Sequence, residues 1–127
     1  MKIRLTNGEE LSLIMVMGGQ KYIQGASRDC LSFIFDDTVS MDEVDRIFTE
    51  ENCETITIIG DDNSEAIHKG YAIRAELKKS IETVERETPD ALTETVNRII
   101  VSMAQRTYAE TKLAENTAVL SELLGGN

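Results

Sequence analysis

A capping box at Thr107-Tyr108-Ala109-Glu110 constrains the fold of this chain more than any other pattern. In such a box the threonine hydroxyl accepts from the amide three residues on, and the glutamate accepts from the threonine amide, so a helix begins there. The residues before it permit two interpretations. Their apolar spacing fits a single helix over 89–124, but the box places a helix start near residue 108 instead.

The segment between residues 71 and 105 then has to be something other than helix. Ile99-Ile100-Val101 is β-branched, and β-branched residues favour strands. We therefore predict a long hairpin with strands at about 71–84 and 94–105 and a polar tip around Pro89. A terminal helix at about 108–124 follows it.

The first third of the chain reads as strands separated by glycine turns. Residues 2–5 alternate between charged and apolar, and Asn7-Gly8 favours a tight hairpin turn. Leu11 to Met17 is apolar apart from Ser12, which predicts a single well-buried strand that ends at Gly18-Gly19. Cys30 to Phe35 predicts the next strand, and Tyr22-Ile23 permits a short one before it.

The middle third predicts one helix and a further hairpin. Ser40-Met41-Asp42-Glu43 is another capping box, so we expect a short helix at about 41–50. Thr55 to Ile59 is β-branched and predicts a strand, residues 60–63 a turn, and residues 66–69 a returning strand.

Together these patterns predict an α+β fold. A mostly antiparallel β body carries one short inserted helix, about 41–50, and a C-terminal helix, about 108–124. We divide the chain into a β-rich domain, 1–106, and a terminal helix segment, 107–127, that either docks on its own sheet or self-associates. The candidate contact residues of this helix recur at helical spacing; they are Leu113, Thr117, Leu120 and Leu124.

The charge of the chain is concentrated in one segment. The formal net charge is -10, and residues 36–65 hold eleven acidic side chains and one basic side chain. Such a surface repels phosphates, so we expect no nucleic-acid partner. The acidic side chains of this segment either attract a basic protein, or only keep the surface of a helix and two turns in contact with water. The candidate acidic patch comprises Asp36, Asp37, Asp45, Glu51 and Asp62.

No pattern predicts catalysis, a cofactor or a metal. His68 is the only histidine, and an exposed hairpin residue is its simplest interpretation. Asp61, Asn63 and Glu65 have the first spacings of a calcium loop, but the later positions that need glycine and glutamate are both alanine. The glycines form no phosphate-binding motif. We therefore expect no catalytic, cofactor or metal site.

Two cysteines, Cys30 and Cys53, indicate free buried thiols in a reducing compartment. No apolar stretch approaches a membrane span, and the start of the chain lacks the apolar run of a signal peptide. We expect a bacterial cytoplasmic or virion location, without a membrane partner.

Two segments of the sequence resemble those of a known group of proteins. The first is Ile58-Ile59-Gly60-Asp61-Asp62 leading into Gly70-Tyr71, and the second runs from Ile99 to Glu110 and on to Leu113-Ala114-Glu115. Together they resemble small structural proteins of Gram-positive siphophages and prophages. The resemblance implies a β-rich module with a terminal helix, serving a tail or baseplate and bringing no catalytic residues.

The expected function is therefore a non-enzymatic structural or adaptor protein that acts by assembly. Its expected partners are proteins, tail proteins or further copies of the chain. The alternative is a small acidic inhibitor or regulator that binds a basic partner. A small enzyme built around His68 is a third hypothesis, and it requires a concave pocket at that residue.

Overall fold

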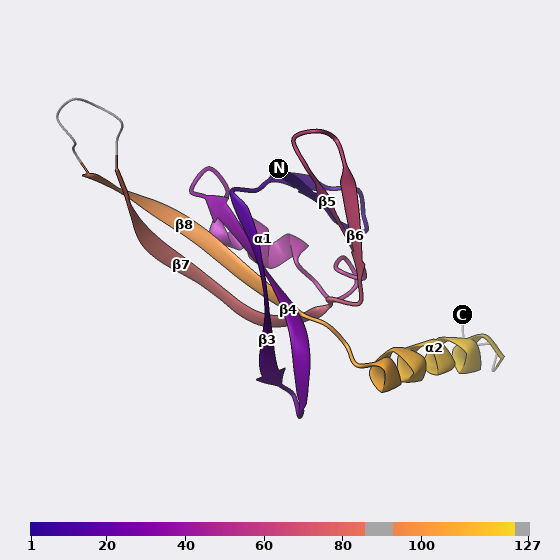
Figure 1. Ribbon diagram of the computed structural model, residues 1–127. Helices are drawn as coiled ribbons and strands as arrows, with labels where there is room; N and C mark the ends of the chain where they lie inside the picture. Colours follow the sequence, from indigo (N-terminus) through magenta and orange to yellow (C-terminus); the bar gives the residue numbers. More distant parts are fainter. Residues whose placement is uncertain (86–92, 124–127) are drawn as a thin grey trace.

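The computed structural model describes residues 1–85 and 93–123, which form two four-stranded antiparallel sheets and two helices (Figure 1). Sheet A has the order β2-β1-β5-β6, and sheet B the order β3-β4-β8-β7. The strands of sheet A are β1 (Lys2–Arg4), β2 (Glu10–Ser12), β5 (Thr55–Ile59) and β6 (Glu65–Lys69). Those of sheet B are β3 (Met15–Ile23), β4 (Ala26–Asp36), β7 (Ile73–Glu85) and β8 (Thr93–Ala104). The helices are α1 (Met41–Ile47) and α2 (Tyr108–Leu123), so the predicted α+β fold with a mostly antiparallel β body is confirmed.

The segment with two interpretations is a hairpin and not a helix. Strands β7 and β8 pair antiparallel from Ile73↔Ala104 to Glu85↔Thr93, with a register shift between Arg74 and Glu76. The β-branched Val101 explains the outcome, because it is fully buried in the body between β4 and β7. The tip predicted around Pro89 lies outside the described residues.

The prediction of one buried strand from Leu11 to Met17 is wrong. Leu11 belongs to β2 in sheet A, whereas Met15 begins β3 in sheet B, and buried Leu13 lies where the chain crosses between the sheets. Beyond the crossing, Met15 and Met17 are 47% and 48% exposed. A largely apolar run can contribute residues to two sheets in turn, and periodicity alone does not reveal where it divides.

The glycine pair at 18–19 does not end a strand. Strand β3 continues through it to Ile23, so the separate short strand expected at Tyr22-Ile23 is the end of the same element. The strand predicted at Cys30–Phe35 is part of β4, which begins four residues earlier and ends one residue later than predicted.

Helix α1 joins the two sheets through one apolar core. The Ser40 hydroxyl accepts from the Glu43 amide at 3.1 Å, as the capping pattern predicts, but the helix ends at Ile47, earlier than the predicted residue 50. Phe48 follows it, and its ring centroid lies 5.9 Å from those of Phe33 and Phe35. Core residues of both sheets and of α1 therefore form one cluster.

Both cysteines are free and buried, as predicted. Burial raises the pKa of the Cys53 thiol to about 12 and also raises that of Cys30. A thiol reacts as its thiolate, so neither side chain is activated as a nucleophile. In the part of the chain that the structure describes, no helix is long and apolar enough to cross a bilayer.

Candidate interaction surfaces

Helix α2 begins at the predicted capping box. The Glu110 amide donates to the Thr107 hydroxyl at 3.2 Å, and the Thr107 amide donates to the Glu110 carboxylate at 2.9 Å. Both donors would otherwise lack a partner inside the helix. The box therefore fixes the first turn of α2 and the position of the Glu110 carboxylate.

Arg28 connects this first turn to the β body. The Arg28 side chain, at the start of β4, is 1% exposed and pairs with both oxygens of the Glu110 carboxylate. It also donates to the carbonyl oxygens of Ile23 at 2.8 Å, Gln24 at 3.2 Å and Gln105 at 3.2 Å. One planar guanidinium thus holds the β3–β4 turn, the end of β8 and the start of α2 together.

A second arginine secures the segment between β8 and α2. The Arg106 amide donates to the Gly70 carbonyl oxygen at 2.9 Å. Its guanidinium, 12% exposed, pairs with Glu50 at 2.7 Å and also with Glu54. The segment is therefore tied to the chain on both sides of β5 and β6.

A third arginine caps the end of helix α1. Arg74, on β7, donates to the carbonyl oxygens of Asp45 and Phe48 at 2.8 Å each and pairs with the Asp45 carboxylate. A cation beside the last carbonyls of a helix also stabilises the helix dipole.

A cavity of about 830 Å³ lies between the end of α1, the start of β7 and the start of α2. Its lining includes Phe48, Glu50, Ala72, Arg74, Arg106 and Leu113. Because Arg74 and Arg106 already pair with carboxylates, a negatively charged ligand would have to displace one of these carboxylates.

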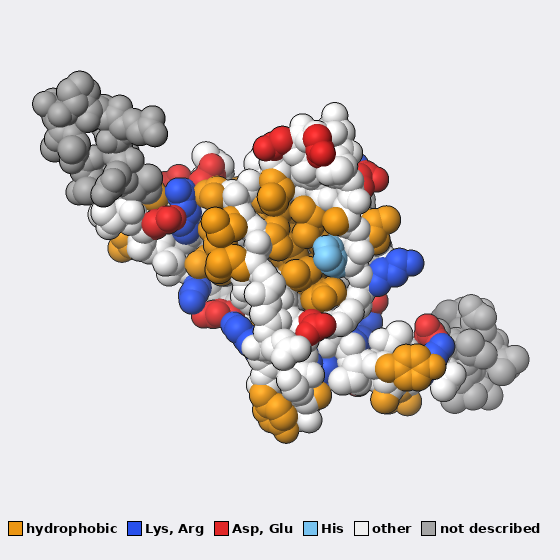
Figure 2. Space-filling view, in the orientation of Figure 1, with side chains coloured by type: hydrophobic (Ala, Val, Ile, Leu, Met, Phe, Trp, Pro, Cys, Tyr) orange, Lys and Arg blue, Asp and Glu red, His pale blue; other side chains and the backbone are white. Residues whose placement is uncertain are grey.

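Past its first turn, α2 extends away from both sheets (Figure 1). Figure 2 shows the same feature as a projection at the opposite end of the molecule from the β7–β8 hairpin. Among the predicted contact residues, Leu113 is 68% exposed, and neighbouring Tyr108 is 79% exposed. The side chains of Thr117 and Leu120, and the whole of Leu124, lie outside the described part.

The five residues of the candidate acidic patch lie in two places. Asp36 ends β4, and Asp37, Asp45 and Glu51 follow in α1 or in the segments on either side of it, whereas Asp62 lies in the β5–β6 turn. Three of them have partners within the chain. Asp36 accepts from the Thr38 amide at 2.9 Å, Asp62 from the Ser64 amide at 3.0 Å, and Asp45 pairs with Arg74. Hydrogen bonds from the Thr38 hydroxyl and then from its amide lower the pKa of Asp36. Those from the Ser64 hydroxyl and then from its amide lower the pKa of Asp62.

The other sequence candidates do not assemble a chemical site. His68 lies on β6, half-buried, with its ring 5.8 Å from that of Tyr71 in an edge-on arrangement. No group of three or more His, Cys, Asp or Glu side chains within residues 1–85 and 93–123 is placed to hold a metal ion.

The Arg28–Glu110 pair predicts a pH dependence of α2. Hydrogen bonds from Arg28, and then from the Thr107 amide, lower the pKa of Glu110 to about 2 from its ordinary value of 4.5. The pair therefore contributes stability fully above pH 4.5, and this contribution is lost as the pH falls through about 2. We expect a steep loss of the helical signal at 222 nm between these two values.

Glu110→Gln serves as the control for this titration. The other carboxylates of the chain remain, so the difference between the two pH profiles isolates Glu110. Identical profiles for the wild type and the variant would show that this carboxylate does not control α2.

The arginines of this region were missed by the sequence analysis. Arg28 and Glu110 are 82 residues apart in the chain, and no local pattern connects them. The only signal was the capping box, which identifies Glu110 but not its partner.

A comparison with known protein families, curated proteins and solved structures finds no match for the chain.

Proposed function

We propose that this chain is a non-enzymatic structural or adaptor protein whose β body presents helix α2 for assembly with other protein subunits. One observation carries the proposal: α2 is fixed at its first turn by buried Arg28, and the rest of the helix extends away from the sheets (Figure 1). An isolated helix of this length is marginal in water and gains most of its stability from packing. A helix mounted in this way is therefore suited to packing against a neighbouring subunit.

The resemblance of the two segments at 58–71 and 99–115 supports a phage or prophage tail or baseplate as the assembly. It implies a β-rich module with a terminal helix, and that is the arrangement on which the proposal rests. The chain would then act in the virion, or in the bacterial cytoplasm before assembly.

The acidic inhibitor has less support from the geometry. Several carboxylates of the acidic segment already pair with arginines from elsewhere in the chain, such as Asp45 with Arg74 and Glu50 with Arg106. A surface that mimics nucleic acid needs its negative charges free of such partners.

Replacing two leucines of α2 with aspartate tests the role of this helix. In the variant with Leu113→Asp and Leu120→Asp, charges stand in the apolar row, so contacts between helices of different copies should be lost. We expect light scattering to give a lower mass than for the wild type, with the β-sheet signal in the far-ultraviolet spectrum unchanged.

A control places one such charge on the β body. Ile67→Asp changes another exposed apolar residue, on β6, and should leave the mass unchanged. A wild-type mass that the double variant does not lower would contradict assembly of copies through α2.

A further inference from the structure

Strand β3 is the least protected of the four edge strands that the two described sheets present. The two edges of sheet A are short, with three residues in β2 and five in β6. In sheet B, β7 is long but carries many charges and a register shift, features that discourage pairing with another chain. Its charged residues between 74 and 82 are Arg74, Glu76, Lys78, Lys79 and Glu82.

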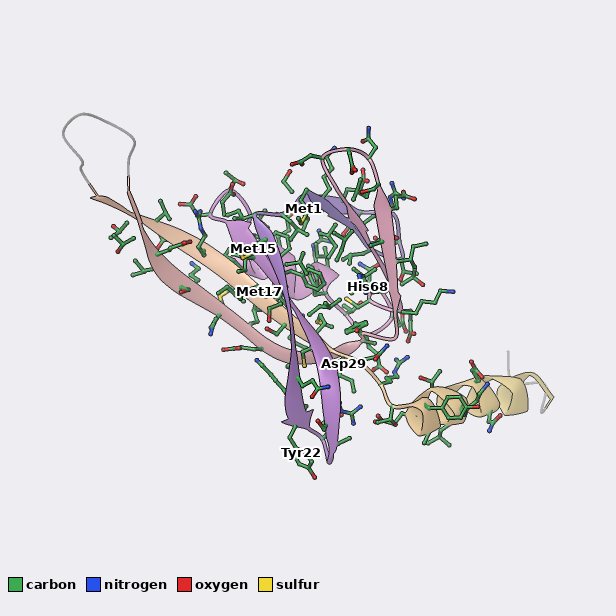
Figure 3. The ribbon with its side chains drawn as sticks, viewed as in Figure 1. Met1, Met15, Met17, Tyr22, Asp29 and His68 are labelled. Atoms are coloured by element: carbon green, nitrogen blue, oxygen red, sulfur yellow. The ribbon has the colours of Figure 1, made fainter. Side chains whose placement is uncertain are left out.

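By contrast, β3 has nine residues, no proline and one charged residue, Lys21, which pairs with Glu76 of the same chain at 3.2 Å. Figure 3 shows Met15 and Met17 along one half of this strand and Tyr22 near its other end, where the side chain is 76% exposed. Apolar side chains gather on both sides of β3 in Figure 2. A long edge strand that is largely apolar, and whose one charge is already paired, is a site for strand addition.

The turn after β3 determines which backbone groups face outward. Gln24 and Gly25 both have positive φ, 50° and 79°, so β3 and β4 are joined by a two-residue turn with Ile23 opposite Ala26. In such a hairpin the pair next to the turn is hydrogen-bonded, and hydrogen-bonded residues then alternate. The odd-numbered residues of β3 therefore bond to β4, and Val16, Gly18, Gln20 and Tyr22 direct their amides and carbonyls away from the sheet.

We propose that β3 of two copies pair antiparallel about a two-fold axis at Gly19, so that two four-stranded B sheets become one continuous sheet. Gly19 is the middle residue of the nine, so this register pairs the strand along its whole length. It sets Val16 opposite Tyr22 and Gly18 opposite Gln20 of the other copy. All four direct their backbone amides and carbonyls outward, so in this register those of one copy form hydrogen bonds with those of the other.

Two features of this register favour a second copy as the occupant of the edge. The two Gly19 residues face each other in a pair without hydrogen bonds, where Cα atoms approach to about 4.5 Å and small residues fit best. Lys21, the only charge on the strand, faces the apolar Met17 of the other copy, so no like charges meet. The acidic excess of each copy belongs to residues 36–65, outside the paired strand.

Glycine 19 also offers a way to test the interface without harming the subunit. A Cβ placed there meets nothing within 4 Å, and its backbone does not have the positive φ that excludes side chains. Gly19→Lys and Gly19→Glu should therefore both fold as single subunits. In the dimer, however, each would place two like charges directly opposite one another, which is destabilising.

The experiment measures mass by light scattering in the Leu113→Asp, Leu120→Asp background, so that contacts through α2 do not contribute. In that background we expect twice the chain mass of 14.1 kDa for the unmodified strand. Gly19→Lys and Gly19→Glu should each give the mass of one chain. An equimolar mixture of the two should regain the dimer mass, because opposite charges then meet at the axis.

Each other result overturns the β3 dimer. The β3 dimer is contradicted if the chain with unchanged Gly19 has the mass of one chain. It is also contradicted if Gly19→Lys and Gly19→Glu each keep the dimer mass. Failure of the mixture to regain the dimer mass removes the two-fold register at Gly19, and unfolded variants could not produce that recovery. Failure of α2 assembly would appear separately, as identical masses with and without the two leucine substitutions.

Discussion

Replacing Arg28 with methionine is expected to detach helix α2 from the β body and to lower the melting temperature of the whole chain. The substitution keeps an unbranched side chain but removes the guanidinium, and with it the hydrogen bonds that Arg28 donates to Glu110 and to three carbonyl oxygens. A buried acceptor that loses its donor costs about 1–3 kcal/mol. For a domain of this size we therefore expect a fall of about 10 °C in melting temperature.

Two further substitutions make this result specific. Arg98→Met removes a different arginine, whose partner Glu82 is well exposed, and such pairs contribute about 0–1 kcal/mol. Arg28→Lys keeps the charge but loses the planar fork, so it should restore little. Circular dichroism at 222 nm follows the helix during the melt. Equal effects of Arg28→Met and Arg98→Met would contradict the role assigned to Arg28.

The second large effect is expected from Phe48→Ala in the core. Phe48 is 1% exposed, and its ring packs against Phe33 and Phe35 directly after α1. Removing a buried phenylalanine ring leaves a cavity and costs about 3–5 kcal/mol. Urea unfolding followed by far-ultraviolet circular dichroism measures this loss.

The matched control is Ile81→Ala, on the part of β7 where the side chain is 74% exposed. A surface change of this kind alters stability by less than about 0.5 kcal/mol. If both substitutions lowered the urea midpoint equally, the core assigned to Phe48 would be wrong.

The parts of the fold that depend on local chemistry could be predicted from the sequence. Strand β5 was predicted with its observed bounds because Thr55 to Ile59 are all β-branched. The capping box at Thr107 gave the start of α2 for an equally local reason, since both of its hydrogen bonds lie within one turn. The same box decided between hairpin and helix for the preceding segment.

What depends on long-range contact could not be predicted. The run from Leu11 to Met17 is apolar apart from Ser12, yet it divides at Leu13 because the chain changes sheets there. The position of α2 depends on Arg28, whose guanidinium meets groups 77 and 82 residues further along the chain. The acidic segment also pairs with Arg74 of β7 and with Arg106 of the segment between β8 and α2, which its own composition does not indicate.

The order in which the strands are used has a consequence for synthesis on the ribosome. Sheet B contains β3 and β4 from the start of the chain and β7 and β8 from its end, with much of sheet A made in between. Pairings between such distant strands form slowly, since a long loop has to close first. A nascent chain therefore carries the Arg28 guanidinium without its last partners until β8 and α2 emerge. The ribosome must therefore translate beyond residue 110 before Arg28 can pair with Glu110.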